Sequence, residues 1–214
     1  MSNFYGENMR NLEDLTKKAH ELKEKGFTTG EIADELNVSR ETAVWLLMRK
    51  EKMKEEVIPR DIFVDWSTIG GSPLRLRNLA IAMADLLYEC LNEKKLPEPE
   101  VIVGIATSGI PLATIVADYI EASMTVIRPK KTIWEPEVAE KVKGVITPNF
   151  AVVQRKKVVI IDDVITTGST LQESISLLRE VGAEPLAVVV LVDKKGIDKI
   201  DEVPVKALVK VVRI

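Results

Sequence analysis

The stretch Val158-Val-Ile-Ile-Asp-Asp-Val-Ile-Thr-Thr-Gly-Ser-Thr-Leu171 combines a strand, an acidic pair and a polar turn. Its β-branched apolar run at 158–161 predicts a buried strand, and the apolar spacing that begins near Leu171 predicts a helix. Two acids are expected where the strand ends, followed by the turn at 166–170. A strand, a turn and a helix in this order are the repeating unit of a parallel sheet covered by helices.

The chemistry of this turn predicts a ligand. Small residues supply backbone N–H groups and hydroxyls at the positive end of a helix, which is a site for a phosphate group. The two carboxylates would repel a phosphate, but they suit sugar hydroxyls or a hydrated Mg²⁺. The alternative is a plain acidic turn, against which the complete run argues. The residues expected to bind a ribose phosphate are Asp162, Asp163, Val164, Ile165, Thr166, Thr167, Gly168, Ser169 and Thr170.

Apolar strands alternate with helices on both sides of this unit. Such alternation indicates an α/β fold with a parallel sheet covered on both faces. Ligands of such sheets bind at the carboxyl ends of the strands. Strands are expected at 101–106, 124–127, 186–192 and 205–211, and helices at 74–92, 111–121 and 171–181.

Further polar segments follow other predicted strands and are expected to converge on the same crevice. The turn at 107–111 is rich in small residues, and a basic segment begins at Arg128 and could neutralise a pyrophosphate. Taken alone, the first segment is as readily a plain strand–helix turn, and the alternative for the basic segment is a solvated loop, which is less favoured than a binding role. Residues 192–196 could touch the base of a nucleotide, although a surface turn is the simpler interpretation. The residues expected to bind pyrophosphate are Thr107, Ser108, Gly109, Arg128, Lys130 and Lys131.

Residues 1–56 are helical in pattern and predict a domain separate from residues 57–214. Thr28 and Glu31 have the spacing of a capping box, a tight turn is expected at Asn37, and Ser39 is placed to cap the next helix. This order resembles a helix-turn-helix, whose second helix reads the major groove of DNA. The alternative is an ordinary three-helix bundle.

The net charge and the local charge differ in what they indicate about DNA binding. The whole chain has a net charge of −3, which does not indicate a nucleic-acid-binding protein. Residues 39–54 nevertheless carry five basic side chains against two acidic ones, and these cations could contact DNA phosphates. Trp45 could instead pack at the edge of the domain. The DNA-binding candidates are Ser39 and, from the expected exposed face of the helix, Arg40, Glu41, Thr42 and Trp45.

Composition indicates the cellular setting. A single cysteine excludes a disulfide framework and suits a reducing cytosol. The N-terminus lacks the pattern of a secretory signal. The most apolar stretch, 101–116, is interrupted by Gly104, Gly109 and Pro111, so it is not expected to span a membrane. We therefore expect a cytoplasmic protein with no membrane partner.

The run Asp162–Thr170 resembles the ribose-phosphate loop of type I phosphoribosyltransferases, which bind phosphoribosyl pyrophosphate (PRPP). The resemblance covers residues 101–192. It is closest to orotate phosphoribosyltransferase, through Ile105-Ala-Thr-Ser-Gly-Ile-Pro-Leu-Ala113 and the Arg128 loop. It implies PRPP bound with Mg²⁺, a metal held through the ligand, with Asp162 and Asp163 as the nearest protein groups. It also implies a non-proline cis peptide bond that precedes or follows Ser108.

The segment that should close over pyrophosphate departs from the enzyme's pattern. The enzyme continues with a further Lys and a His-Gly pair, whereas residues 132–137 here read Thr-Ile-Trp-Glu-Pro-Glu. The one histidine, His20, lies in the N-terminal domain. An intact PRPP pocket, an altered lid and a helix-turn-helix together resemble the archaeal orotate phosphoribosyltransferase-like transcriptional regulators of the GfcR type.

That resemblance implies a homodimer that binds a palindromic DNA operator. Its effector would be PRPP or a related phosphorylated sugar or nucleotide. The resemblance favours a regulator that is not an enzyme, and it leaves catalytic activity open. The alternative is an active phosphoribosyltransferase, acting on orotate or a purine, whose N-terminal domain is an accessory.

Overall fold

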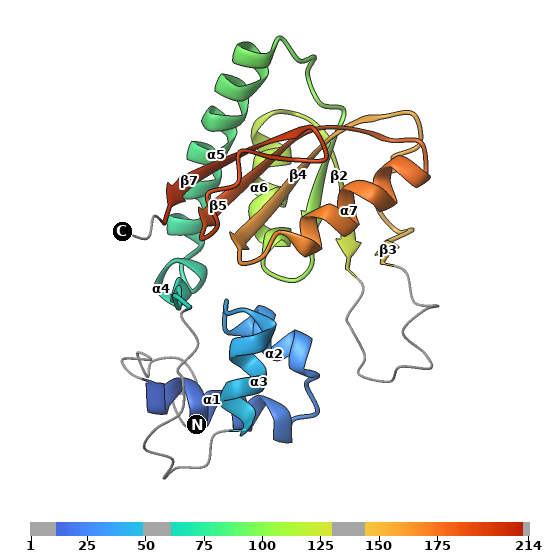
Figure 1. Ribbon diagram of the computed structural model, residues 1–214. Coiled ribbons are helices and arrows are strands. Elements are labelled where there is room, and N and C mark those ends of the chain that lie inside the picture. Colours follow the sequence, from blue (N-terminus) through green and yellow to red (C-terminus); the bar gives the residue numbers. More distant parts are fainter. Residues whose placement is uncertain (1–11, 49–60, 130–143, 212–214) are drawn as a thin grey trace. The chain divides into compact units, whose positions relative to one another are not determined.

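The computed structural model describes residues 12–48, 61–129 and 144–211 (Figure 1). Within these ranges the chain forms two compact units, an N-terminal unit that ends at Trp66 and a second unit that begins at Ser67. The second unit is named the effector unit after the role that the sequence leads us to expect for it. The boundary expected between residues 56 and 57 lies outside the described residues. No helix in the described ranges is both long enough and apolar enough to cross a membrane.

The N-terminal unit contains three helices, α1 (Leu12–Glu24), α2 (Thr29–Glu35) and α3 (Arg40–Met48). The start of α2 is the expected capping box: the Thr28 hydroxyl accepts from the Glu31 N–H at 3.3 Å, and the Glu31 carboxylate accepts from the Thr28 N–H at 2.8 Å. One apolar core holds the three helices together, because each contributes its inward face. The buried members of that core are Ala19, Leu22, Ile32, Ala33, Leu36, Val38, Ala43 and Leu46.

A short turn at residues 36–39 joins α2 to α3. Asn37 has a φ of +51° there, a left-handed conformation that asparagine tolerates better than most residues. Ser39 then ends the turn, and its hydroxyl accepts from the Thr42 N–H at 3.2 Å, which caps the first turn of α3. The turn and the serine cap expected from the sequence are both confirmed.

The effector unit is an α/β fold built on one seven-stranded sheet, in the order β3-β2-β1-β4-β5-β7-β6. The five inner strands run parallel, as expected, whereas β3 and β6 pair antiparallel with their neighbours. Two-residue strands carry no periodic pattern, so the sequence did not indicate them. The elements are α4 (Ser67–Gly70), α5 (Pro73–Lys94), β1 (Val101–Ile105), α6 (Gly109–Tyr119), β2 (Ser123–Arg128), β3 (Val145–Ile146), β4 (Lys157–Ile165), α7 (Ser169–Glu180), β5 (Glu184–Asp193), β6 (Lys199–Ile200) and β7 (Val203–Lys210).

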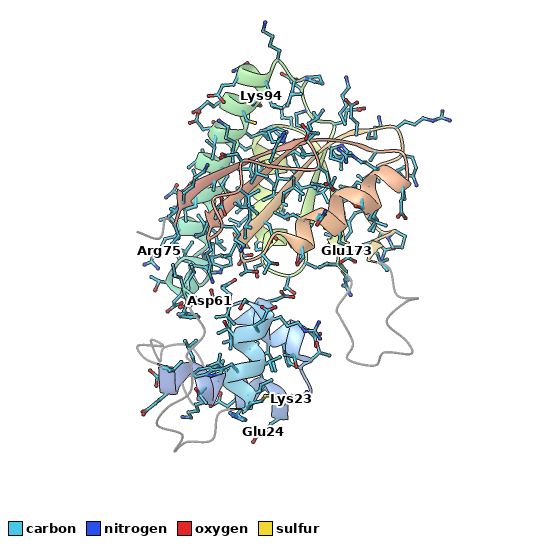
Figure 2. The ribbon with its side chains drawn as sticks, in the orientation of Figure 1. Lys23, Glu24, Asp61, Arg75, Lys94 and Glu173 are labelled. Atoms are coloured by element: carbon cyan, nitrogen blue, oxygen red, sulfur yellow. The ribbon has the colours of Figure 1, made fainter. Side chains whose placement is uncertain are left out.

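Helices cover both faces of the sheet (Figure 1). On one face, α7 packs Leu171, Ile175 and Leu178 into a core shared with β1, β4 and β5. On the other face, α6 lies so close to β1 that a Cβ on Gly104 would stand 2.9 Å from the Cβ of Ala113. The helix α5 packs beside α6 and against β5 and β7, and Figure 2 shows it running from the neighbourhood of Arg75 to Lys94. Apolar packing therefore covers both faces of the sheet and holds in place the strand ends that carry the site.

Candidate functional site

The carboxyl ends of the inner strands meet at one edge of the sheet. Register aligns Ile105 of β1 with Ile127 of β2, and Ile165 of β4 with Asp193 of β5. The loops that follow β1, β4 and β5 consequently start at the same edge, and Arg128 ends β2 there. The prediction that these segments start at one edge of the sheet is confirmed for the described residues.

The acidic pair lies inside a strand and not after one. Strand β4 continues to Ile165, and Asp162 is paired in register with Val190 of β5. The expectation that both acids follow the strand was wrong, because pairing with β5 extends β4 beyond its apolar run. Both side chains are buried, at 8% exposure for Asp162 and 6% for Asp163. The Asp162 Oδ1 accepts a hydrogen bond from the Asp163 N–H at 2.9 Å.

Asp163 has an unsatisfied polar atom. Its Oδ2 is buried and has no hydrogen-bond partner in the described part of the chain. Burial raises the pKa of Asp163 above its ordinary value, and its hydrogen-bond interactions with the Asp162 side chain, the backbone of Val164 and Asp163, and the Ser108 side chain only partly oppose this rise. Buried carboxylate oxygens in native proteins have partners. A hydroxyl donated by a ligand would satisfy this one.

The loop between β1 and α6 lies directly against the acidic pair. A Cβ on Gly109 would stand 2.7 Å from the Ile161 carbonyl oxygen and 3.1 Å from the Asp162 Oδ1, so only glycine fits. Ser108 is the residue before the helix, and its side chain makes no capping hydrogen bond. The Ile110 N–H donates to the Thr107 carbonyl at 3.2 Å, but the Ser108 side chain does not cap the first turn of α6, and a helix start without such a cap can bind an anion.

The cis peptide bond expected beside Ser108 is one residue earlier than predicted. It joins Ala106 to Thr107. Strand β1 ends at Ile105, but the Ala106 N–H still donates to the Ile127 carbonyl at 2.8 Å. The chain thus leaves the sheet at Ala106 and turns between Ala106 and Thr107. The helix α6 likewise begins at Gly109, two residues before the expected start at residue 111.

The loop between β4 and α7 presents hydroxyls at a second helix start. Gly168 precedes α7 with a φ of +86°, and a Cβ there would stand 2.9 Å from the Ile197 side chain. The hydroxyls of Thr167 and Ser169 lie 2.8 Å apart and are exposed. The Ser169 N–H donates to the Thr167 hydroxyl over a long 3.4 Å, and the N-cap residue itself, Gly168, has no side chain to cap this end of α7. The helix begins at Ser169, slightly before the expected position, so the expected polar turn includes its first residues.

A third loop, which follows β5, is organised by a residue that the sequence analysis did not single out. The carboxylate of Asp193 is fully buried and accepts from three successive N–H groups, those of Lys195, Gly196 and Ile197, at 2.7–2.9 Å. This folds the loop back until Ile197 meets Gly168. An acid followed by Lys-Lys-Gly is a signal for a turn held by a side chain, and it could have identified Asp193.

The remaining anion-binding candidates are partly described. Arg128 is exposed at the end of β2, whereas Lys130, Lys131 and the expected lid at 132–137 lie outside the described residues. No group of three or more potential metal-binding side chains exists in the described ranges. Two adjacent carboxylates with one unsatisfied oxygen fit sugar hydroxyls, and a metal carried by the ligand's own phosphates fits beside them.

The DNA-binding candidates are divided between exposed and buried positions. Glu41 is exposed and Arg40 and Ser39 are half-buried. The expectation that Thr42 projects from the exposed face of α3 was wrong: it is 8% exposed, and its hydroxyl donates to the Asp61 carboxylate at 2.9 Å. Trp45 packs half-buried against the helical core, as its alternative interpretation held. The helical spacing of α3 could not indicate this contact, because Asp61 lies outside the helix and comes from a segment 19 residues further along the chain.

The effector unit defines the class of this protein. The family model described as "Phosphoribosyl transferase domain" matches residues 73–212, which include the acids within β4 and the starts of α6 and α7. The fold is also that of the orotate phosphoribosyltransferase from Aeropyrum pernix, with a TM-score of 0.53 at 19% identity, covering 86% of this chain and 93% of that one. The adenine phosphoribosyltransferase from Rhodothermus marinus gives 0.52 at 23% identity, covering 72% and 88%.

Relatives that match both units identify the family more narrowly than the match to the effector unit alone. The protein named transcriptional regulator GfcR 1 from Methanosarcina barkeri is 50% identical over 96% of this chain and 100% of its own length. Transcriptional regulators named GfcR from Methanocella arvoryzae and Halorubrum lacusprofundi are 47% and 45% identical, each over 96% of this chain. The chain belongs to the GfcR family of archaeal transcriptional regulators, as the sequence resemblance indicated.

Proposed function

We propose that this protein is a DNA-binding transcription regulator whose effector unit binds PRPP, or a related phosphorylated sugar or nucleotide. The observation that carries the proposal is the buried, unpartnered Oδ2 of Asp163. Asp163 interacts with Ser108, the residue before α6, and lies in the strand whose following loop starts α7, and neither helix has a hydrogen bond from the side chain of its N-cap residue. A hydroxyl acceptor flanked by two anion sites matches a sugar that carries phosphate groups.

Each part of the site would have its own task. Asp162 and Asp163 would accept hydrogen bonds from the ribose hydroxyls. The turn from Thr166 to Thr170, at the start of α7, would bind the 5-phosphate through N–H groups and hydroxyls. The residues proposed for the pyrophosphate are Thr107, Ser108, Gly109, Arg128, Lys130 and Lys131. Mg²⁺ would be held by the pyrophosphate, and it would supply charge neutralisation there.

The regulator interpretation is favoured over catalysis by two observations. The relatives that match both units are named transcriptional regulators. The one histidine of the sequence is exposed on α1 of the N-terminal unit, so no histidine of the effector unit serves proton transfer. We propose a cytoplasmic homodimer in which two copies of α3 read the halves of a palindromic operator, as two-fold symmetry requires.

Ligand binding separates the regulator from the enzyme. Calorimetry with PRPP and Mg²⁺ is run beside a turnover assay with orotate, uracil, adenine, guanine, hypoxanthine and xanthine. We expect binding without turnover, and the Asp163→Asn variant should lose the binding. The control is Asp85→Asn, which changes an exposed acid on α5. Turnover of any base at an enzyme-like rate would favour the active-transferase alternative, and no binding would contradict the sensor role.

DNA binding is tested separately. Affinity for the protein's own promoter region is measured between about 50 and 200 mM salt, where phosphate contacts make affinity fall steeply. Arg40→Ala should weaken binding by roughly tenfold, corresponding to about 1–3 kcal/mol for a lost DNA contact. Lys94→Ala, at the far end of α5 in the effector unit, is the matched control for the loss of one cation. An affinity independent of salt would exclude phosphate contacts and the proposed role.

A further inference from the structure

The segment that leads into the effector unit is attached to the helical unit at three points. Phe63 packs against the helical core. The Val64 carbonyl accepts from the Asn37 side chain, in the turn before α3, at 3.4 Å. The third point is Asp61, labelled in Figure 2, whose carboxylate contacts the start of α3. Residues 61–66, here named the strap, are thus fixed to the turn and to the first residues of the proposed recognition helix.

The Asp61 contact occupies the N-terminus of α3. Its Oδ2 accepts from the Ser39 N–H at 2.6 Å and from the Thr42 hydroxyl at 2.9 Å. The Ser39 and Thr42 hydroxyls also lie within 2.8 Å of one another. A carboxylate is favourable at the positive end of a helix. The donors at the start of α3 thus form an anion-binding site, and the Asp61 carboxylate occupies it.

This position is valuable for contacts with DNA. The N-terminal residues of a recognition helix approach the major groove, and helix N-termini with small hydroxyl residues bind backbone phosphates. With Asp61 in place, the Ser39 N–H and the Thr42 hydroxyl already have a partner. A phosphate approaching the same groups would also meet a negative charge.

We propose that the strap masks the N-terminus of α3, and that the effector unit controls DNA binding by holding or releasing it. This rests on the proposed function, because it assumes that α3 contacts DNA. Asp61 is then a positioning residue, since it acts on DNA through Ser39 and Thr42. The strap ends at Trp66 and the effector unit starts at Ser67, so a change in the effector unit reaches the strap directly through the chain.

A purely structural cap would make a different prediction. Asp61 would then only stabilise α3, and its loss would weaken DNA binding equally with and without effector. Masking predicts the opposite sign, because removing the carboxylate frees the helix terminus and removes a like charge. It also predicts that the variant loses its response to the effector.

The test measures DNA affinity of the full-length protein, with and without PRPP and Mg²⁺, for the wild type and Asp61→Asn. Asparagine keeps the shape of the side chain and can still accept from the Ser39 N–H, so the helical unit should fold. We expect Asp61→Asn to bind DNA about five- to tenfold more tightly than the wild type. The ratio of its affinities with and without PRPP should fall to within about twofold of one. The control Glu35→Gln removes an exposed charge at the end of α2 and should keep the wild-type ratio.

The possible results separate failure of the masking proposal from failure of the proposed function. If the wild type binds DNA and responds to PRPP, and Asp61→Asn responds equally, masking by the strap is overturned while the regulator role stands. Weaker DNA binding by Asp61→Asn also overturns masking, since it shows a structural cap. If the wild type binds no DNA, or binds it with no response to PRPP, the proposed function fails in that respect and the strap fails with it.

Hydrogen exchange gives a second readout that does not depend on DNA. The Ser39 N–H is donated to the strap, so its protection reports whether the strap is docked. On addition of PRPP, protection at residues 39–42 should change in the wild type and stay constant in Asp61→Asn. Unchanged protection of this segment in the wild type would contradict control through the strap.

Discussion

The helices α3 and α7 begin with similar residues and have different partners. A serine and a threonine lie at the start of each helix: Ser39 and Thr42 at α3, and Thr167 and Ser169 at α7. At α3 the Ser39 hydroxyl caps the helix and the Asp61 carboxylate binds the terminus. At α7 the residue before the helix is Gly168, the Ser169 N–H donates to the Thr167 hydroxyl over a long 3.4 Å, and both hydroxyls are exposed.

This difference teaches that a polar helix start is not a ligand site by composition alone. Tertiary partners decide whether the N–H groups are satisfied within the protein or remain for a ligand. The α3 terminus should therefore contribute to the stability of the helical unit. The α7 terminus should contribute little to stability and much to ligand binding.

The largest expected effect concerns a third helix start, that of α6. Gly109→Ala would place a Cβ 2.7 Å from the Ile161 carbonyl oxygen, and a backbone atom inside a sheet cannot move aside cheaply. We expect a loss of about 1–3 kcal/mol in the free energy of unfolding, as for overpacked cores, together with loss of PRPP binding. Urea denaturation and calorimetry measure the two. Gly30→Ala, where a Cβ meets nothing within 4 Å, is the control, and equal stability of the two variants would show that α6 is not held tightly against β4.

The next effect concerns the unsatisfied acid. The pKa of Asp163 is raised by burial, so the folded protein binds this proton more tightly than the unfolded chain. The Asp163 contribution is therefore most favourable below the ordinary carboxyl pKa, and it is lost as the pH rises from there to the raised pKa.

Asp163→Asn should remove this loss, because the amide does not ionise. At pH 7 we expect the variant to be more stable than the wild type by about 1 kcal/mol, or roughly 2–4 °C in Tm, while PRPP binding falls on the order of 10- to 100-fold. Thermal unfolding at pH 4 to 8, with Asp85→Asn as control, measures the difference. A variant less stable than the wild type at pH 7 would show that the ionised carboxylate is satisfied within the protein.

The smallest effects compare the two termini directly. Ser39→Ala removes the cap of α3 and should cost about 1 kcal/mol in the helical unit. Thr167→Ala removes an exposed hydroxyl and should change stability by less than about 0.5 kcal/mol, while weakening PRPP binding by a few-fold. Denaturation followed by circular dichroism, beside calorimetry, tests the pair. If Thr167→Ala cost as much stability as Ser39→Ala, the contrast between the two termini would be wrong.

The sequence was sufficient for the features that depend on local pattern. The apolar runs around Val103, Ile160 and Val189 located the parallel strands, because a strand buried on both faces is apolar throughout. The capping box at Thr28 and the left-handed turn at Asn37 followed from their residue types. The convergence of the loops followed from the carboxyl-edge rule.

Features that depend on pairing between distant segments were not predictable. Asp162 and Asp163 look like turn residues, and only the ladder with β5 makes them part of a strand. Thr42 has the spacing of an exposed helical residue, and only Asp61 from residues 61–66 buries its hydroxyl. Asp193 is a different case, because the residues after it carry a turn signal, and only the identity of its three backbone N–H partners required the structure.

The edges of the sheet affect how the effector unit behaves at high concentration. An open sheet exposes unpaired main-chain groups along its outermost strands, and these can recruit other chains into aggregates. Here the outermost strands, β3 and β6, are only two residues long and antiparallel to the strands they protect. On the β7 side, however, β6 pairs only with Val203 and Pro204, so the remainder of β7 forms the edge at which another chain could add a strand. The charged side chains of Lys206 and Lys210 on that stretch oppose such pairing, since lysines on an edge strand disfavour the approach of a second sheet.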